Sequence, residues 1–223
     1  MCGRFVLAHA TAEIARAFAA APANDLPEGP DYNVCPTQTV PAVVSREGSR
    51  RLVPMRWGFV PHWYKTPTDG PLLINARAET VAEKPAFRAA ARARRCIVPA
   101  SLFYEWTKDA DGNRLPWCFG AAEAGALIAF AGLWQDWGPE DARIATCAIV
   151  SCAAGPAMAE IHHREPVTLR PEDWATWLGE TDAKAAPLMR AGPEGHLRRW
   201  RVSTAVNSNR AAGEDLIEPV DPE

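Results

Sequence analysis

Short apolar runs separated by turn residues extend along most of the chain, a pattern typical of a β-rich fold. Residues 40–45 and 51–57 flank Glu47-Gly48 and predict a hairpin. Two apolar, β-prone runs at residues 126–134 and 144–150 favour buried strands. Further short strands are expected at residues 96–98, 102–106 and 199–203. The pattern therefore predicts a sheet of many short strands.

Helical periodicity is confined to short segments. Ile14 and Phe18 are four residues apart and would share one face of a helix that Thr11 caps. Pro171 favours the first turn of another helix. Other helical segments are expected at residues 84–94 and 155–161. Residues 19–36 contain four prolines and predict an irregular excursion.

The order of these elements, with strands in the body of the chain and helices at its margins, predicts the α+β class. We expect a single domain over residues 1–223 with a curved, mostly antiparallel sheet and peripheral helices. No internal repeat, long low-complexity linker or composition shift marks a boundary that would divide the chain.

The composition is that of an ordinary globular protein, with 48% hydrophobic and 23% charged residues among 223. The net charge of −3 argues against a surface that binds polyanions everywhere, although a local basic groove is compatible with it. No apolar signal-peptide core and no run of ~20 apolar residues occurs, so we expect a cytoplasmic protein without a membrane partner. Six irregularly spaced cysteines predict reduced thiols rather than a disulfide framework.

Cys2 is the most informative residue, because aminopeptidases generally remove Met1 before a small second residue. The product would carry an amine and a thiol on adjacent carbons, with reference pKa values of ~8 and ~8.5. Both nucleophiles are therefore expected to have reactive fractions near neutral pH. Such a 1,2-aminothiol condenses with an aldehyde to an imine, which the thiol closes to a thiazolidine. It can also attack an amide, and a small apolar residue without chemistry is the third interpretation.

Three polar positions elsewhere are candidates for the same chemistry. Asn75, in a polar stretch after an apolar run, can orient a carbonyl group or hold a loop. Glu105 lies among aromatic residues, where desolvation would disfavour its charge and suit it to proton transfer; an exposed edge position is the alternative. His162 and His163 form the only histidine pair. A general acid or base is the better interpretation than zinc, since no Cys or His spacing typical of a metal site accompanies them.

Four aromatic residues occur within residues 57–64. Some of them must serve the core. The end of this segment, Trp63-Tyr64, could instead present rings that stack on unpaired bases.

These segments together resemble the SOS response-associated peptidase (SRAP) family of abasic-site processing proteins. The matching segments follow the family's order along the chain: Met1-Cys2-Gly3-Arg4-Phe5, Tyr32-Asn33-Val34-Cys35-Pro36, Trp57-Gly58-Phe59-Val60-Pro61, Ile74-Asn75-Ala76-Arg77-Ala78-Glu79-Thr80, Cys96-Ile97-Val98-Pro99-Ala100, Phe103-Tyr104-Glu105-Trp106, Ile161-His162-His163-Arg164-Glu165-Pro166 and Leu216-Ile217-Glu218-Pro219-Val220. Each is weakly specific, whereas the ordered set is highly specific.

The resemblance implies one SRAP domain with a β-barrel-like core, and a covalent reaction with abasic sites in single-stranded DNA. It implies that Cys2 forms the crosslink and that Asn75, Glu105 and His162 line the same pocket. It further implies that DNA is bound by five residues: Arg4, Arg77 and Arg164 at phosphates, and Trp63 and Tyr64 as rings wedged against bases. No cofactor or metal is expected. The implied partner is single-stranded DNA with abasic sites, including single-strand/duplex junctions, and a monomer associated with the nucleoid when bound to DNA is expected.

Two positions depart from the family pattern. Tyr64 stands where a second Trp or a Phe is frequent, and it keeps an aromatic ring. His163 stands where Asp is frequent, which makes the pocket less acidic. Removal of Met1 by the protein itself, reversal of the crosslink and strand cleavage by β-elimination are chemically allowed. The alternatives are an N-terminal-nucleophile amidohydrolase of the glutamine amidotransferase kind and a non-covalent single-strand binder.

Overall fold

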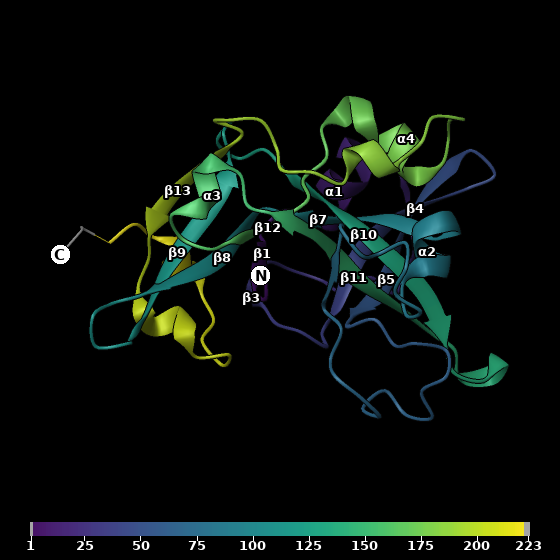
Figure 1. Ribbon diagram of the computed structural model, residues 1–223, viewed down its shortest axis with the longest axis horizontal. Coiled ribbons are helices and arrows are strands. Elements are labelled where there is room, and N and C mark those ends of the chain that lie inside the picture. Colours follow the sequence, from purple (N-terminus) through teal and green to yellow (C-terminus); the bar gives the residue numbers. More distant parts are fainter. Residues whose placement is uncertain (1, 221–223) are drawn as a thin grey trace.

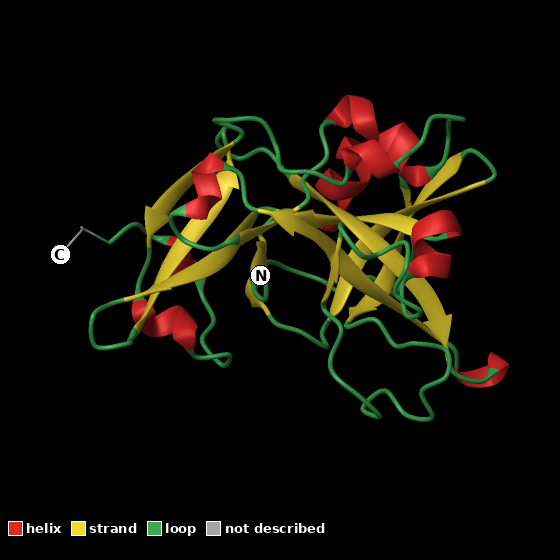
Figure 2. Ribbon diagram, in the orientation of Figure 1, coloured by secondary structure: helices red, strands yellow, loops and turns green. Residues whose placement is uncertain are grey.

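The computed structural model describes residues 2–220 and consists mostly of strands with a few short helices (Figures 1 and 2). The strands are β1 Phe5–Leu7, β2 Ala21–Pro22, β3 Asp31–Val34, β4 Thr39–Arg46, β5 Ser49–Trp57, β6 Asn75–Arg77, β7 Arg95–Ala100, β8 Leu102–Lys108, β9 Arg114–Ala121, β10 Ile128–Trp137, β11 Ile144–Ala153, β12 Arg164–Pro166 and β13 Leu197–Arg201. The helices are α1 Thr11–Ala17, α2 Arg88–Ala93, α3 Pro156–Ala159 and α4 Trp174–Leu178, with 3-10 turns at Glu140–Ala142, Pro171–Asp173, Ala186–Leu188, Thr204–Asn207 and Glu214–Ile217. The predicted α+β class is confirmed.

The strands form two sheets, one of five strands in the order β13-β9-β8-β1-β3 and one of eight. The larger sheet has the order β12-β11-β10-β7-β4-β5-β2, and β6 pairs with β11. Most pairs are antiparallel, but β6 and β5 each run parallel to β11, and β2 runs parallel to β5. The larger sheet curves enough for β5 and β11 to meet over two residue pairs. The sheets do not close into a barrel. The expected barrel-like core therefore corresponds to a curved but open larger sheet.

Aromatic side chains fill the space between the two sheets. Phe5 of β1 packs against Trp57 of β5 at a centroid distance of 5.0 Å and against Phe130 of β10 at 6.1 Å. Phe103 and Phe119, opposite each other on β8 and β9, stack at 4.9 Å. Strand β1 therefore belongs to the small sheet, and its Phe5 side chain packs that sheet against the large one. This packing fixes the position of the residues just before β1.

The helices cover the margins, as expected, although one predicted cap is wrong. Helix α1 starts after Ala10, and Glu13 accepts a hydrogen bond from the Ala10 N–H. Thr11 is therefore the first residue inside the helix and not its cap, and the Glu13 carboxylate satisfies the N–H of the cap residue Ala10. The buried Phe18 packs on Trp174 at 4.3 Å, which joins α1 to α4.

Local sequence signals located some strands well and missed others. The predicted hairpin is present as β4 and β5, with positive φ at both Glu47 and Gly48, as a tight two-residue turn requires. The predicted irregular stretch 19–36 is only partly irregular, because it contains β2 and β3. Within residues 2–220, no helix is both long and apolar enough to cross a membrane.

Candidate functional site

Cys2 lies three residues before the start of β1 and is fully buried in the main core cluster. Its thiol approaches the backbone oxygen of Arg4, with an Sγ–O distance of 3.8 Å. Strand β1 pairs with β8 through Phe5 and Phe103, which places the first residues beside the strand that carries Glu105. Met1, whose removal is expected from the sequence, lies outside the described residues.

Asn75 holds the backbone of Cys2. It opens β6, which is positioned by parallel pairing with β11 opposite Ile149. Its side-chain Nδ2 donates a hydrogen bond of 2.8 Å to the carbonyl oxygen of Cys2. The Oδ1 atom of the same amide is buried and makes no hydrogen bond within the described chain. The structure therefore brings Asn75 and Cys2 together, as the site hypothesis requires, and leaves the Asn75 Oδ1 atom without a hydrogen-bond donor among residues 2–220.

Glu105 is buried in β8, with only 3% of its surface exposed. Full burial raises the pKa of the Cys2 thiol well above its usual range, and the negative charge of Glu105 raises that pKa further. Burial beside a carboxylate therefore disfavours the thiolate of Cys2 in the chain that still carries Met1. The reactive fractions expected for the amine and thiol of the processed N-terminus stay a prediction.

His162 precedes β12, on the other side of β11 from Asn75. Ser151 of β11 pairs with Arg77 of β6 on one side and with Pro166 of β12 on the other. The Nδ1 atom of His162 lies 3.0 Å from both the backbone nitrogen and the backbone oxygen of Arg164. Its ring stacks on His163 at 4.4 Å, and the positive charge of His162 is the main cause that lowers the pKa of His163.

Two of the three predicted phosphate-binding arginines make bonds inside the protein. Arg4 is 9% exposed and donates from Nη1 to Asn33 Oδ1 at 2.6 Å and to Val206 O at 3.1 Å. Arg164, also 9% exposed, forms a two-pronged ion pair with Glu79 at 2.9 and 3.1 Å. Their contacts with DNA stay predictions.

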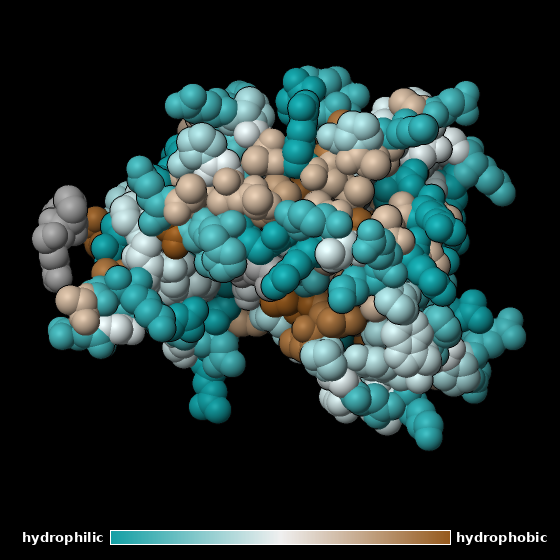
Figure 3. Space-filling view, viewed as in Figure 1, coloured by the Kyte–Doolittle hydropathy of each residue, from teal (hydrophilic) through white to brown (hydrophobic). Residues whose placement is uncertain are grey.

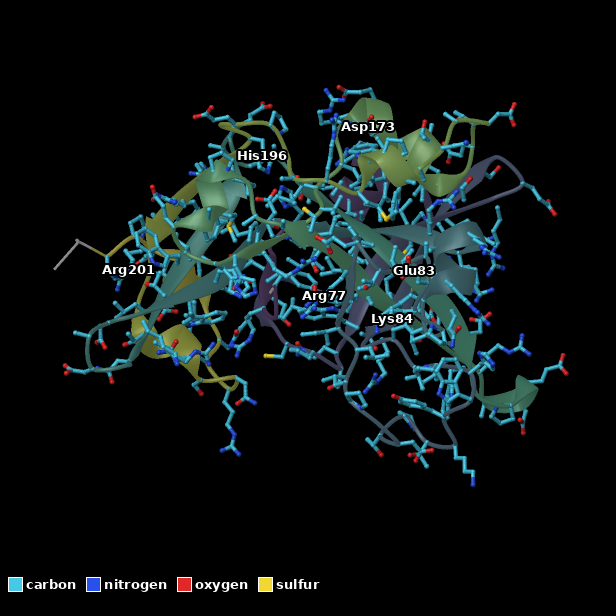
Figure 4. All side chains as sticks on the ribbon, in the orientation of Figure 1. Arg77, Glu83, Lys84, Asp173, His196 and Arg201 are labelled. Atoms are coloured by element: carbon cyan, nitrogen blue, oxygen red, sulfur yellow. The ribbon has the colours of Figure 1, made fainter. Side chains whose placement is uncertain are left out.

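Arg77 differs from the other two arginines, because it is exposed on β6. Figure 4 labels it near the centre of the view. Its position two residues after Asn75 places its Cα on the same strand face as that amide. Its charge contributes to lowering the pKa of His163, so the two groups lie near each other.

The predicted aromatic wedge lies on the loop that joins β5 and β6. Trp63 is 49% exposed and meets the half-buried Tyr64 edge-on at 6.3 Å. Trp137 of β10 fixes the loop by donating from Nε1 to Tyr64 O at 2.9 Å. Leu72, on the same loop, is 48% exposed. Hydrophobic residues gather below the centre of the face in Figure 3, beside this loop.

Sequence reasoning missed two residues that bind Arg164. Glu79 binds Arg164 and also accepts a hydrogen bond from the Ala153 N–H, and Arg164 lowers the pKa of Glu79. Ser151 accepts from Arg164 through its backbone oxygen at 2.6 Å. The alternation of polar residues at 75, 77 and 79 could have identified Glu79. A single serine in an apolar run could have identified Ser151. Among residues 2–220, no cluster of three or more His, Cys, Asp or Glu side chains could hold a metal ion.

Comparisons with known proteins agree over nearly the whole chain. The chain is 36% identical to the abasic site processing protein YoqW of Bacillus subtilis, covering 98% of this chain and 99% of that protein. It is 30% identical to the abasic site processing protein YedK of Escherichia coli, covering 99% and 100%. A crystal structure of a protein from Bacteroides thetaiotaomicron has the same fold, with a TM-score of 0.84, 21% identity and coverage of 98% and 100%.

The family described as SOS response associated peptidase (SRAP) matches residues 1–209 of this chain. That match covers Cys2, Asn75, Glu105 and His162 together. The chain belongs to the SOS response associated peptidase family.

Proposed function

We propose that this protein captures abasic sites in single-stranded DNA as a covalent thiazolidine with Cys2, after Met1 has been removed. The observation that carries the proposal is the hydrogen bond from Asn75 to the Cys2 carbonyl beside the buried Glu105. It holds the N-terminal residue in one position next to a proton-transfer group, which suits an amine that must meet an aldehyde. The relatives named abasic site processing proteins supply the substrate class.

The reaction forms two bonds to one carbon. The Cys2 amine attacks C1′ of the open sugar and releases water, which gives an imine. The Cys2 sulfur then adds to that carbon, and the thiol proton moves to the nitrogen, which closes the thiazolidine. The amine reacts first because the thiol closes the ring on the imine carbon that the amine creates, and the burial that raises the pKa of the thiol is consistent with this order. Glu105 accepts and returns the protons, and His162 assists opening of the sugar ring.

The DNA contacts complete the proposal. Arg77 is exposed and would meet a phosphate, while Arg4 and Arg164 would present only the parts of their guanidinium groups that their internal partners leave accessible. Trp63 and Tyr64 would stack at a single-strand/duplex junction. We further propose that the protein acts as a monomer in the cytoplasm, at the nucleoid when DNA is bound. Reversal of the crosslink, strand cleavage through the imine and self-removal of Met1 are secondary activities of the same pocket.

The deciding experiment uses a single-stranded oligonucleotide with one abasic site. Intact mass first establishes that Met1 is gone, and a denaturing gel then detects crosslinked protein. We expect a shifted band for the unmodified protein and none for Cys2→Ala. Cys2→Ser is the matched control, because it keeps the amine and carries a hydroxyl in place of the thiol: borohydride should trap its imine, whereas no crosslink should form without reductant. A band in Cys2→Ala would contradict the proposal, as would its absence in processed, folded wild type, and a glutaminase assay would then test the amidohydrolase alternative.

A further inference from the structure

A row of side chains leads away from Glu105 across the small sheet. Glu105 of β8 is directly opposite Trp117 of β9, and Trp117 is directly opposite Arg201 of β13. Neighbouring strands are about 4.8 Å apart, so Arg201 lies about 10 Å from Glu105. Exposure rises along the row, from the buried Glu105 to the half-buried Trp117 and Arg201. In Figure 4, Arg201 lies at the left edge of the molecule.

The row lies on the face that carries the site. Trp117 packs against the core cluster that includes Cys2 and Phe103. Trp200, which precedes Arg201 on β13 and is opposite Cys118, packs against the separate cluster on the other face, with Tyr104. Successive residues of β13 alternate between faces, so Arg201 shares the face of Trp117 and Arg198 shares that of Trp200.

Trp117 gathers two guanidinium groups. The Cζ atom of Arg201 lies 5.3 Å from the Trp117 ring centroid, and that of Arg199 lies 5.7 Å away. Arg199 is already engaged, because it binds the Ala157 oxygen and the Glu160 carboxylate. Arg201 donates only from Nε, to Pro116 O at 3.3 Å, and no carboxylate pairs with it within residues 2–220. Its two terminal amino groups therefore point to a ligand outside the chain.

We propose that Arg201, oriented by Trp117, is a phosphate subsite for the DNA strand that leaves the abasic nucleotide over β9 and β13. A guanidinium held over a ring loses part of its freedom of orientation, and its planar fork of N–H groups matches a phosphate. A distance of about 10 Å corresponds to roughly three nucleotides of a stacked strand at ~3.4 Å each, and to fewer when the strand is extended. The inference rests on the proposed function for the position of the abasic sugar. Trp117 is a positioning residue.

The test measures binding rather than crosslinking, by fluorescence anisotropy at several salt concentrations. The probes are an undamaged single-stranded oligonucleotide and one with a stable abasic analogue that lacks the aldehyde. Arg201→Gln should weaken binding of both about 5- to 10-fold and reduce the salt slope by ~0.7, the value for one lost phosphate contact on a single strand. Trp117→Leu should weaken binding with a smaller change in slope, because the charge stays while its orientation is lost.

Matched variants make the result specific. Arg198→Gln removes the same charge from the opposite face, where Arg198 lies 4.7 Å from the Trp200 ring, and should bind as wild type. Arg201→Lys should keep the salt slope and recover only part of the affinity. When the oligonucleotide is shortened from one end, the Arg201→Gln defect should disappear in the series that shortens the strand over β13, and persist in the other.

Four outcomes would overturn the subsite: wild-type binding by Arg201→Gln, an equal defect in Arg198→Gln, a defect that persists in both shortened series, or no binding of either probe. Thermal unfolding of Arg201→Gln near that of wild type excludes misfolding as the cause of a defect. Failure of the proposed function is distinguishable, because it abolishes the Cys2-dependent band while the undamaged probe still reports on Arg201.

Discussion

Asn75 donates its side-chain amide to the carbonyl oxygen of Cys2 across 73 residues of sequence, at 2.8 Å. The bond restrains the backbone of Cys2 through its carbonyl oxygen. The Asn75 side chain does not bond to the nitrogen or the thiol of Cys2. It depends on β6 and β11, whose pairing fixes Asn75. Cys2 is therefore positioned by an element of the large sheet while it precedes a strand of the small one.

Removing this bond should slow crosslinking without unfolding the protein. In Asn75→Asp, a carboxylate of the same shape faces the Cys2 carbonyl and cannot donate to it. We expect single-turnover crosslinking to slow about 10- to 100-fold, because a small displacement of a reacting group has effects of that size. Asn75→Ala should slow it less, since it adds no repulsion. Equal rates for Asn75→Asp and wild type would remove the positioning role.

The ion pair between Arg164 and Glu79 should give stability a specific pH dependence. The hydrogen bonds of Arg164 lower the pKa of Glu79 from its ordinary value of 4.5. The carboxylate thus stabilises the fold above pH 4.5, and this contribution is lost as pH falls through the lower folded-state pKa. Glu79→Gln should lose about 1 kcal/mol at pH 7, a small amount because half of the Glu79 side chain is exposed. Urea unfolding should show the two proteins converging below pH 4; a constant difference would contradict the assignment.

Thiol labelling should distinguish Cys35 from the other five cysteines. Cys35 is partly exposed, whereas the others are buried, and burial raises the pKa of Cys147 to about 12. At pH 7.5 we expect iodoacetamide to modify Cys35 first, and Cys35→Ser to label at least tenfold more slowly, by mass spectrometry. All six should react in denaturant. Rapid labelling of Cys2 in the folded protein would show that the buried conformation opens readily.

Trp63→Ala should remove the preference for single-strand/duplex junctions. The ring is half exposed, so its loss should leave thermal stability nearly unchanged. We expect the ratio of crosslinking rates on junction and unbroken single strands to fall toward one. Leu72→Ala, which removes another half-exposed side chain from the same loop, is the control and should keep the preference. An unchanged ratio in Trp63→Ala would remove the wedge role.

Glu165 is predicted to be a stability determinant. It is 1% exposed and accepts from the Gly155 N–H at 2.8 Å and the Gly192 N–H at 3.1 Å. Glu165→Ala leaves two partly buried donors without their acceptor and should reduce the free energy of unfolding by about 3 kcal/mol. Glu165→Gln keeps one acceptor and should lose about half as much. Denaturant titration measures both, and equal losses would mean that only one bond contributes.

The sequence located elements whose signal is local. The β4–β5 hairpin follows from two apolar runs and a Glu-Gly turn, and the four expected reactive-site residues lie in recognisable segments. Strand β3 was missed because tertiary contacts hold it: Tyr104 donates to Tyr32 O, and Asn33 donates to Ala211 O. Strand β9 was missed because Pro116 and Gly120 interrupt its pattern. The internal partners of Arg4 and Arg164 lie up to 202 residues away, beyond the reach of local pattern.

The burial of Cys2 also has a consequence for biosynthesis. Asn75 and Glu105, which surround Cys2, are synthesised after it, and so is β11, the strand that supports β6 and ends at Ala153. At about 5–20 residues per second, some 8 to 30 seconds pass between synthesis of Cys2 and synthesis of Ala153. During that interval the N-terminus is accessible to processing enzymes and to small aldehydes alike. Any modification of the N-terminus by these agents therefore has to occur before folding buries Cys2.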